Sequence, residues 1–296
     1  MTDSPIRTSL DGDVGIITID RPDRFNSMDV TTARDFRRAG LQFARDDRAR
    51  CVIIRGTGKI FCSGADLKYI RARRGETDFS YLRGANGDEP RGWQPSGGFG
   101  DGFKEILEYL HSTISEIKRA PKPFIAAVNG VAAAGGFGIA MACDLVYMAE
   151  SATLEWAYHK TGLTGAESST FFLPRLLGLR KAMELVLLNP RLSAADAQSL
   201  GLINGVFADA TFDDDVMRLA QRIAAGPTHA YGIAKHLVNH AAGVEQLDFH
   251  LDEELQHLAR IADGVEFAEG LAAFFDKRAA VFGPESSDRT PPRDAV

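Results

Sequence analysis

Short apolar runs alternate with helix-like segments over the first two-thirds of the chain. Four of these runs are bounded by glycine, proline or charged residues and predict buried strands: residues 14–22, 51–56, 124–130 and 143–150. Over residues 31–45 the apolar positions recur at helical spacing, and Thr31 or Thr32 can serve as the N-cap of that helix. Alternation of strands and helices is typical of an α/β core.

Helical spacing dominates the pattern after Leu202. Four consecutive segments have it: residues 213–226, 228–241, 244–262 and 265–282. They predict a helical region that does not continue the sheet. The pattern therefore divides the chain into a core of residues 1–205, a helical region of residues 206–282 and a polar tail of residues 283–296 that we expect to fray.

A stretch rich in glycine, proline and charge interrupts the core between residues 75 and 102. Long segments without a helix or strand pattern inside a compact domain are usually functional or disordered. We expect a loop over or near a pocket, with a passive surface insertion as the alternative. Trp93 and Phe99 within it would line that pocket or cover a surface.

Composition and charge restrict the class of protein. Of the 296 residues, 45% are hydrophobic and 25% are charged, which is ordinary for a globular protein. The formal net charge of −6 argues against a nucleic-acid partner. The polar start has no apolar signal region, and no uninterrupted apolar stretch is long enough to span a bilayer. We therefore expect a cytoplasmic protein with no membrane partner.

Cysteine and histidine positions give no sign of a metal site. The three cysteines, Cys51, Cys62 and Cys143, have no metal-ligand spacing, and Cys51 and Cys143 lie in apolar runs as small buried side chains would. Four histidines lie on the C-terminal helical segments without a chelating arrangement: His236, His240, His250 and His257. We expect no bound metal and a reducing compartment.

Two strand-to-helix turns carry almost no reactive side chains. In one, Ser63-Gly64-Ala65-Asp66 follows an apolar strand, and in the other Gly135 and Gly136 begin a helix. The first amides of a helix have no internal partner, and small residues let an oxygen approach them closely. Two such amides in a dry pocket could form an oxyanion hole, in which one donor is worth about 3–4 kcal/mol of barrier. Tight packing between strand and helix is the structural alternative.

The two turns and their surroundings resemble the paired signature of the enoyl-CoA hydratase/isomerase (crotonase) superfamily. The resemblance rests on FCSGADLK and KPFIAAVNGVAAAGGFGIAMACDLVYMAE. It continues through TGLTGAESSTFFLPRLLG, LSAADAQSLGLINGV and FFDKRAAVF, and covers roughly residues 14–282 in the same order.

The resemblance implies a core of repeated ββα units that binds acyl-CoA, followed by helices that build homotrimers or dimers of trimers. It implies a CoA thioester as substrate, with no permanently bound cofactor, and a thioester carbonyl held by the amides of Ala65 and Gly135. It further places the adenine and phosphates of CoA near Arg24, Ala65, Asp66 and Leu67, and lets Lys277 reach a phosphate of a neighbouring subunit's CoA. Solvated surface charges are the alternative for Arg24 and Lys277.

Both carboxylates of the family's hydratases are missing. Hydration requires one carboxylate to activate water and another to deliver a proton to the α-carbon. The position three residues beyond the oxyanion glycine is Gly138, and the second acidic position, in a QPE block of the family, is Tyr158 in this chain. The resemblance therefore does not extend to ordinary hydratase chemistry.

Glu167 lies where an isomerase branch of the family carries its single base. Aligning FLPR places that acid one position earlier, at Ala166, where a related dehalogenase branch has its nucleophile. Thr164-Gly165-Ala166-Glu167 also has capping-box spacing, which would make Glu167 an N3 cap of the following helix. Base and cap both stay open from the sequence.

Neighbouring polar residues offer further candidates. Tyr158 could donate a hydrogen bond or a proton, although a phenol is a poor base at neutral pH. His159 could act as a general base or be a structural residue, and Asp144 matches a position interpreted as structural.

Three functional hypotheses follow. The first is a double-bond isomerase in which Ala65, Gly135, Glu167 and Tyr158 form the site. The second is thioester hydrolysis, atypical hydration or dehalogenation with Tyr158, His159 or a loop residue contributing. The third is an acyl-CoA-binding protein without catalysis.

Overall fold

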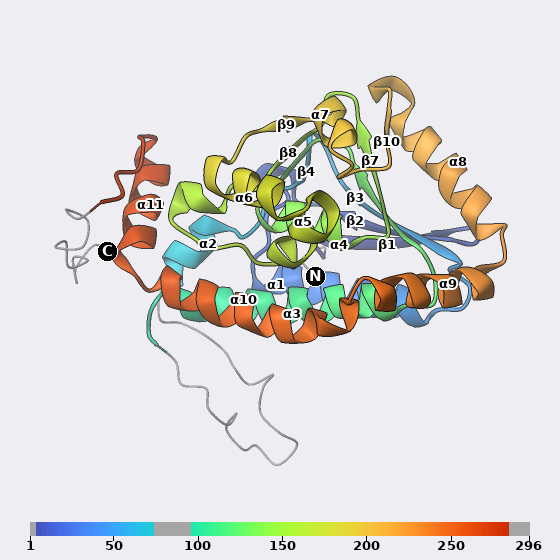
Figure 1. The fold of residues 1–296 in the computed structure, drawn as a ribbon, viewed down its shortest axis with the longest axis horizontal. Coiled ribbons are helices and arrows are strands. Elements are labelled where there is room, and N and C mark those ends of the chain that lie inside the picture. Colours follow the sequence, from blue (N-terminus) through green and yellow to red (C-terminus); the bar gives the residue numbers. More distant parts are fainter. Residues whose placement is uncertain (1–3, 74–95, 284–296) are drawn as a thin grey trace, which may run out of the picture.

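Two sheets form the centre of the fold (Figure 1). The computed structural model describes residues 4–73 and 96–283. The larger sheet contains, in spatial order, β1 (Ile6–Asp11), β2 (Val14–Ile19), β3 (Cys51–Gly56), β5 (Phe124–Val128), β7 (Leu145–Ala149) and β10 (Gly205–Phe207). The smaller sheet contains β4 (Ile60–Cys62), β6 (Val131–Ala133), β8 (Thr153–Glu155) and β9 (Leu192–Ser193). Neighbouring strands are parallel except β1–β2 and β8–β9.

Three successive strand pairs enter both sheets in the same way. In the pairs β3–β4, β5–β6 and β7–β8 the first strand joins the larger sheet and the second joins the smaller one. A helix follows each pair: α2 (Leu67–Ala72), α4 (Gly135–Ala142) and α5 (Ser169–Leu177). The predicted α/β core of repeated ββα units is therefore confirmed.

The predicted strands are present with small shifts at their ends. β3 has the predicted bounds, and every residue of β2 and β5 is buried, as expected for apolar runs with helices on both sides. β2 ends before the proline because a 3₁₀ turn, Pro22–Arg24, follows it. Strand β1 was not predicted, since it is an edge strand with a single buried residue and so lacks an apolar signal.

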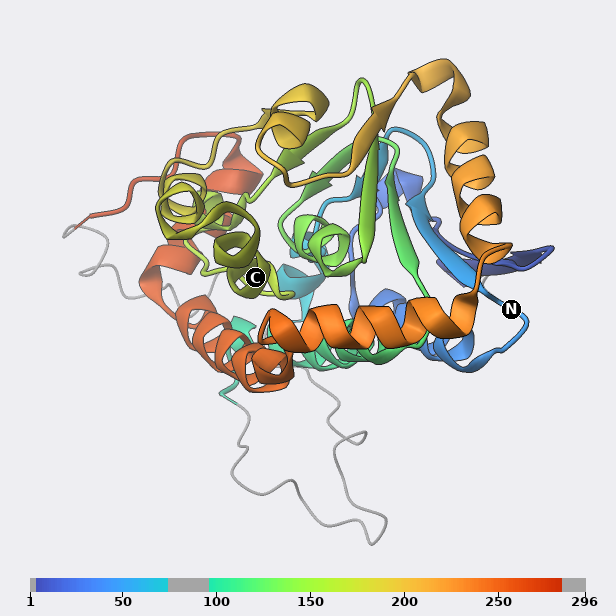
Figure 2. The same cartoon turned by 45° about the vertical axis from the view of Figure 1, so that its right-hand side comes forward.

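Helices surround the sheets, and a long pair of them carries part of the site. The remaining helices are α1 (Val30–Arg45), α3 (Phe99–Arg119), α6 (Leu179–Leu188), α7 (Ala194–Ser199), α8 (Phe212–Ala224), α9 (Thr228–Ala241), α10 (Leu247–Ala262) and α11 (Val265–Asp276). The predicted helical C-terminal region is thus confirmed. Helix α3 packs between α1 and α10, and α3 and α10 stay side by side in the turned view of Figure 2.

Two local predictions are wrong. The N-cap of α1 is Asp29, whose side chain accepts the Thr32 N–H at 2.8 Å, so neither threonine caps the helix. The loop expected over residues 75–102 cannot reach residue 102, because α3 begins at Phe99. A Cβ atom on Gly100 would lie 2.3 Å from the Ala259 carbonyl oxygen, so this glycine serves the contact with α10 rather than a turn.

The remaining parts of that segment and of the tail, residues 74–95 and 284–296, lie outside the described residues, as does Trp93. Phe99 begins α3 and makes an edge contact with Phe267 of α11.

All three cysteines are buried and unpaired, as expected for Cys51 and Cys143, and burial raises the pKa of each thiol to about 12. Among the helices of the described residues, none combines the length and the apolar character that crossing a bilayer requires.

Candidate active site

The turn after β4 leaves the amide of Ala65 unused. Ala65 pairs with Met28 in an isolated parallel bridge, in which Met28 N–H donates to the Gly64 carbonyl and Asp66 N–H donates to the Met28 carbonyl, both at 2.8 Å. In such a bridge the amide of the middle residue points away from its partner. Within residues 4–73 and 96–283, no group accepts a hydrogen bond from the Ala65 N–H. Asp66 caps α2 by accepting the Tyr69 N–H at 3.0 Å.

The turn before α4 leaves the backbone amide of Gly135 without an acceptor in the same way. Gly135 is the first residue of the helix, so its amide has no intrahelical acceptor, and none is found elsewhere in the described part of the chain. The preceding Ala134 has φ 47°, a strained value for a residue with a side chain. The two turns touch, because a Cβ atom on Gly64 would lie 2.9 Å from the Gly135 nitrogen.

A cavity of about 210 Å³ opens beside both turns, and both Ala65 and Gly135 line it. Its other polar lining residues are Ser63, Tyr158, Lys160, Thr161 and Glu167. Its larger apolar lining residues are Leu67, Phe103, Leu163, Leu258 and Phe274. The structure therefore brings the four predicted catalytic residues to one cavity, and Glu167 is the one carboxylate among the described residues that line it.

The two oxygens of the Glu167 carboxylate have different neighbours. Its side chain is 3% exposed, and Oε2 accepts a short hydrogen bond from the Tyr158 hydroxyl. Oε1 lies 2.7 Å from the position that a Cβ atom on Gly135 would occupy, which places it beside the unused amide. Burial raises the pKa of Glu167 to about 8, against the opposing effect of the Tyr158 hydrogen bond. A carboxyl group with this pKa can both take and return a proton near neutral pH.

The Tyr158 hydroxyl has a second acceptor within reach. Its oxygen lies 3.1 Å from the Ala166 carbonyl oxygen, but a hydroxyl has only one proton to donate. The hydroxyl can therefore donate to Glu167 when that group is ionised, and to Ala166 when Glu167 is protonated. Burial, together with the Glu167 charge, raises the pKa of Tyr158 well above its ordinary value, so the phenol stays protonated.

The hypothesis that Glu167 caps a helix at N3 is wrong. Helix α5 begins at Ser169 and its N-cap is Ser168, so Glu167 precedes the helix. Glu167 and Ser168 have φ values of 50° and 64°, each in the left-handed region that costs about 1–3 kcal/mol for a residue other than glycine. This pair of left-handed residues turns the Glu167 side chain toward Gly135, while Ala166, the position of the family's acid in the alignment, is fully buried.

The predicted CoA-binding residues lie at or beside the turn after β4, except Lys277. Arg24 donates to both oxygens of Asp66 at 2.7 Å, and Leu67 lines the cavity. Lys277 is the C-cap that follows α11, is exposed, and has no ion pair among the described residues. Arg24 is thus a partnered charge and Lys277 an unpartnered one.

The other candidate side chains are not part of the cavity lining. His159 is not among the described residues that line it. Asp144 accepts from Lys118, Lys235 and the Phe124 N–H, which confirms its structural interpretation. In the described ranges, no group of three or more His, Cys, Asp or Glu could hold a metal ion.

Residues that the sequence analysis did not single out also shape the site. Phe103 and Leu258 line the cavity from α3 and α10, and His111 and Glu254 contact the Glu167 turn from the same helices. No sequence motif distinguishes these residues, because their part in the site depends on how α3 and α10 pack against the Glu167 turn.

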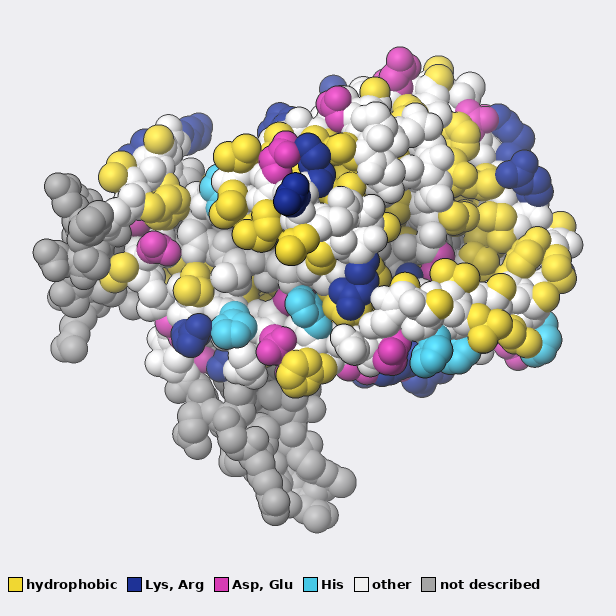
Figure 3. Space-filling view, in the orientation of Figure 1, with side chains coloured by type: hydrophobic (Ala, Val, Ile, Leu, Met, Phe, Trp, Pro, Cys, Tyr) yellow, Lys and Arg dark blue, Asp and Glu magenta, His cyan; other side chains and the backbone are white. Residues whose placement is uncertain are grey.

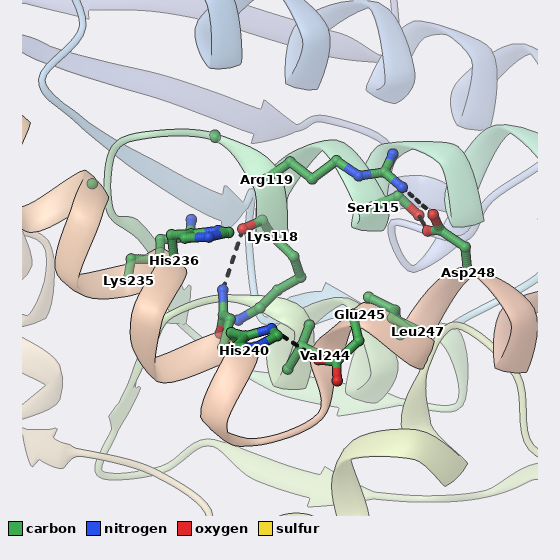
Figure 4. A pocket seen from close by; sticks show the side chains of 13 residues that line it. Ser115, Lys118, Arg119, Lys235, His236, His240, Val244, Glu245, Leu247 and Asp248 are labelled. Carbon is green, nitrogen blue, oxygen red and sulfur yellow. Dashed lines mark hydrogen bonds and ion pairs between the residues drawn. The ribbon is translucent and has the colours of Figure 1, made fainter.

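A second cavity, of about 220 Å³, lies between α3, α9 and α10 and shares no lining residue with the first (Figure 4). Its charged groups have local partners: Asp248 accepts from Ser115 and Arg119, and the Glu245 carboxylate lies 3.7 Å from the His240 ring. Lys118 and Lys235 both form ion pairs with the Asp144 carboxylate, at 3.2 and 2.6 Å. This pairing leaves no concentration of one charge that would select a ligand.

Comparisons with known proteins agree with this geometry. The family model described as enoyl-CoA hydratase/isomerase matches residues 10–85 and 103–285. A 1,2-epoxyphenylacetyl-CoA isomerase of Escherichia coli (strain K12) is 32% identical over 266 residues, which are 90% of this chain and 93% of the relative. A 4-chlorobenzoyl coenzyme A dehalogenase-2 of an Arthrobacter species is 31% identical over 264 residues, 89% of this chain and 88% of the relative.

The fold has the same relatives. The crystal structure of an enoyl-CoA hydratase from Mycobacterium avium subsp. paratuberculosis K-10 superposes with a TM-score of 0.79 at 28% identity, covering 94% of this chain and 98% of that one. The chain belongs to the enoyl-CoA hydratase/isomerase family.

Proposed function

We propose that this member of the enoyl-CoA hydratase/isomerase family moves the double bond of an enoyl-CoA thioester into conjugation. Family membership makes it an acyl-CoA-processing enzyme. The observation that carries the finer proposal is Glu167, the one carboxylate among the described lining residues, which is buried and lies against Gly135 at the cavity wall.

The reaction needs one group that takes and returns a proton. The Glu167 carboxylate removes a proton from the α-carbon of a 3-enoyl thioester, and the electron pair of that C–H bond forms an enolate. The amides of Ala65 and Gly135 stabilise the negative oxygen. The protonated Glu167 then returns the proton to the γ-carbon while the double bond shifts to the α and β carbons. Tyr158 holds Oε2, so that Oε1 faces the substrate.

Hydration fits the site less well, because its two proton transfers require two carboxylates and Glu167 stands alone among the described lining residues. Dehalogenation is the second candidate, since a dehalogenase is among the relatives. A nucleophilic carboxylate must be ionised before it attacks, and burial holds the pKa of Glu167 at about 8. The base that removes an α-proton must be ionised as well, so this pKa does not separate the two reactions, and the release of halide distinguishes them.

We place the acyl group in the apolar part of the cavity and the CoA outside it. Leu67, Phe103 and Leu258 supply apolar contact for the acyl chain. Arg24 and Asp66 lie beside Ala65, and Lys277 follows the helix that carries Phe274, so these residues are the candidates for the adenine and phosphates. In this proposal CoA is part of the substrate and no resident cofactor is needed.

The test is to incubate the protein separately with 3-enoyl-CoA and 2-enoyl-CoA and to follow the absorbance of the conjugated thioester. Isomerisation raises this absorbance with the first substrate, and hydration lowers it with the second. Release of free CoA would indicate hydrolysis, and release of halide from a halobenzoyl-CoA would indicate dehalogenation. Binding of these thioesters without turnover would indicate a non-catalytic protein.

Glu167→Gln is the decisive variant, because it keeps the size of the side chain and removes the base. Glu150→Gln is the matched control, since Glu150 is exposed and lies outside the cavity. Isomerisation that survives in Glu167→Gln at the rate of the control would reject the assigned base.

We further propose assembly into trimers or dimers of trimers. Figure 3 shows hydrophobic side chains gathered over α6 and along α9. Among the large hydrophobic side chains of these two helices, the most exposed are Leu179, Leu187, Leu188, Leu237 and Val238, each at least 60% exposed. Apolar surface of this extent supports self-association. Light scattering coupled to size-exclusion chromatography would test it, and a monomer at micromolar concentration would reject it.

A further inference from the structure

Two buried side chains from distant parts of the chain hold the turn that carries Glu167. The Glu167 N–H donates to Nε2 of His111 on α3 at 3.2 Å, and the Ser168 N–H donates to Oε2 of Glu254 on α10 at 2.8 Å. His111 and Glu254 are 6% and 5% exposed. Neither residue lines the cavity, so neither is placed to contact a substrate.

This turn has neither a glycine at its left-handed positions nor a side-chain cap of its own. Glu167 and Ser168 are consecutive left-handed residues, and Ser168 is the N-cap of α5 without a side-chain capping bond. The Ser168 hydroxyl is buried and has no partner in the described ranges. A helix start of this kind leaves N–H groups that must find acceptors elsewhere.

Glu254 supplies those acceptors. Besides the Ser168 N–H, it accepts the Thr170 N–H at 3.1 Å and the Thr170 hydroxyl at 2.5 Å, both on Oε1. A carboxylate at a helix N-terminus is also favoured by the helix dipole. Glu254, on a helix more than 80 residues further along the chain, therefore caps the N-terminus of α5.

His111 contributes only in its neutral form. A nitrogen that accepts the Glu167 N–H must be unprotonated, and burial lowers the pKa of His111 to about 4 although Glu254 opposes the shift. Nε2 is therefore an acceptor throughout the neutral range.

We infer that His111 and Glu254 are positioning residues that hold the Glu167 carboxylate against Gly135. The inference rests on the proposed function in one respect only, that the carboxylate so placed is the base. Five titratable groups surround this turn: Tyr158 in the cavity lining, Cys62 at the end of β4, His111 on α3, and His250 and Glu254 on α10.

The experiment measures the pKa of Glu167 and the kinetics in the same variants. Carboxyl ¹³C NMR titration, with Glu167→Gln to assign the signal, gives the pKa without turnover. Glu254→Gln removes a negative charge and one acceptor, so we expect the pKa of Glu167 to fall from about 8 toward its ordinary value. We expect kcat for 3-enoyl-CoA to fall at least about tenfold, with KM changed less than about twofold, because the base is displaced while the binding surface remains.

Substitutions of His111 separate position from charge. His111→Phe removes the acceptor without changing the net charge, and we expect the same loss of kcat. His111→Gln keeps an acceptor at a similar reach and should restore part of it. Glu253→Gln is the matched control, because Glu253 is next to Glu254 in the sequence but is exposed. It should change neither quantity.

Unchanged kcat and an unchanged Glu167 pKa in His111→Phe and Glu254→Gln would overturn the inference. If Glu254→Gln does not fold, the His111→Phe and His111→Gln pair decides it by the same two readouts. If the unmutated protein does not isomerise enoyl-CoA but the variants still shift the pKa of Glu167, the positioning role stands and the proposed function fails.

Discussion

A Cβ atom on Gly138 would lie 2.4 Å from the carbonyl oxygen of Glu167 and 2.7 Å from its Cβ. The backbone of Glu167 therefore occupies the space into which a side chain at position 138 would extend. Position 138 is where the resemblance places a hydratase carboxylate, so this chain has exchanged one arrangement for the other. A carboxylate at 138 and Glu167 in its present place exclude each other.

Gly138→Ala should lower both stability and activity. Alanine is better than glycine in a helix interior by about 1 kcal/mol, so a site with free space would gain stability. Here the clash with a backbone atom dominates, and we expect a loss of about 1–3 kcal/mol of unfolding free energy. We expect kcat to fall about 100-fold, because Glu167 must move to admit the methyl group. Urea unfolding and enoyl-CoA kinetics measure the two effects.

Gly102→Ala is the control for this prediction. Gly102 is also inside a helix, but its added Cβ would meet only the flexible Cδ1 atom of Ile70, at 3.0 Å. We expect a change in stability near zero and an unchanged rate. A Gly138→Ala protein that is more stable than the unmutated one and equally active would contradict the packing argument.

The pH dependence of kcat/KM should report Glu167. Burial raises the pKa of this group to about 8, and the ionised form is the one that removes the α-proton. We expect kcat/KM to rise about tenfold per pH unit below this pKa and to level off above it. Tyr158→Phe removes the hydrogen bond that lowers the pKa of Glu167, so the rising limb should move to higher pH.

Tyr231→Phe provides the comparison, because Tyr231 lies on α9 and is 39% exposed. Its profile should coincide with that of the unmutated protein. A flat profile between about pH 6 and pH 9 would show that no group with the properties of Glu167 limits the reaction.

Glu167→Gln should stabilise the protein increasingly as the pH rises. Below about pH 4.5 the carboxyl group is protonated in both the folded and the unfolded state, so it contributes no pH dependence. Between about 4.5 and about 8 the unfolded state is ionised while the folded state keeps its proton, and stability falls with pH by up to about 1.4 kcal/mol per unit. Above about 8 the full penalty is present in the unmutated protein.

Urea unfolding at several pH values measures this difference. The advantage of Glu167→Gln over the unmutated protein should be small near pH 5 and largest near pH 8. Glu150→Gln, at an exposed position, should show no such trend. An advantage that does not change with pH would mean that Glu167 is ionised throughout this range.

The sequence alone predicted those parts of the molecule that depend on local pattern. Each fully apolar run became a buried strand, and the small residues at Ala65 and Gly135 became turns with unused amides. The direction of Glu167 could not be predicted in this way. It depends on two left-handed residues whose N–H groups are accepted by His111 and Glu254, which are far away in the sequence.

The capping hypothesis failed for the same reason. The spacing from Thr164 to Glu167 fits a capping box, but the cap of α5 comes from Glu254 and the helix begins two residues after Glu167. A capping motif does not predict where a helix begins when a side chain from another helix accepts the free N–H groups of its first turn. Ala166 offers no carboxylate, and Glu167 reaches Gly135 through its backbone conformation, which residue identities do not show.

Leu258 should set the length of acyl chain that the cavity accepts. It is 2% exposed and contributes to the cavity wall from α10. Leu258→Ala removes three carbons from this wall, so longer acyl chains should gain about tenfold in kcat/KM relative to short ones. The same substitution should cost about 2–5 kcal/mol of stability, as for other buried leucines.

Leu107→Ala separates these two effects. Leu107 is 1% exposed on α3 and does not belong to the described lining of the cavity, so it should lose similar stability without changing chain-length preference. Competition between short and long 3-enoyl-CoA substrates measures the preference directly, because the ratio of products gives the ratio of kcat/KM values. If both variants shift the preference equally, the change follows from general loosening of the core, and the apolar wall of this cavity does not select the substrate. If only Leu258→Ala shifts it, the acyl chain lies against α10 at Leu258.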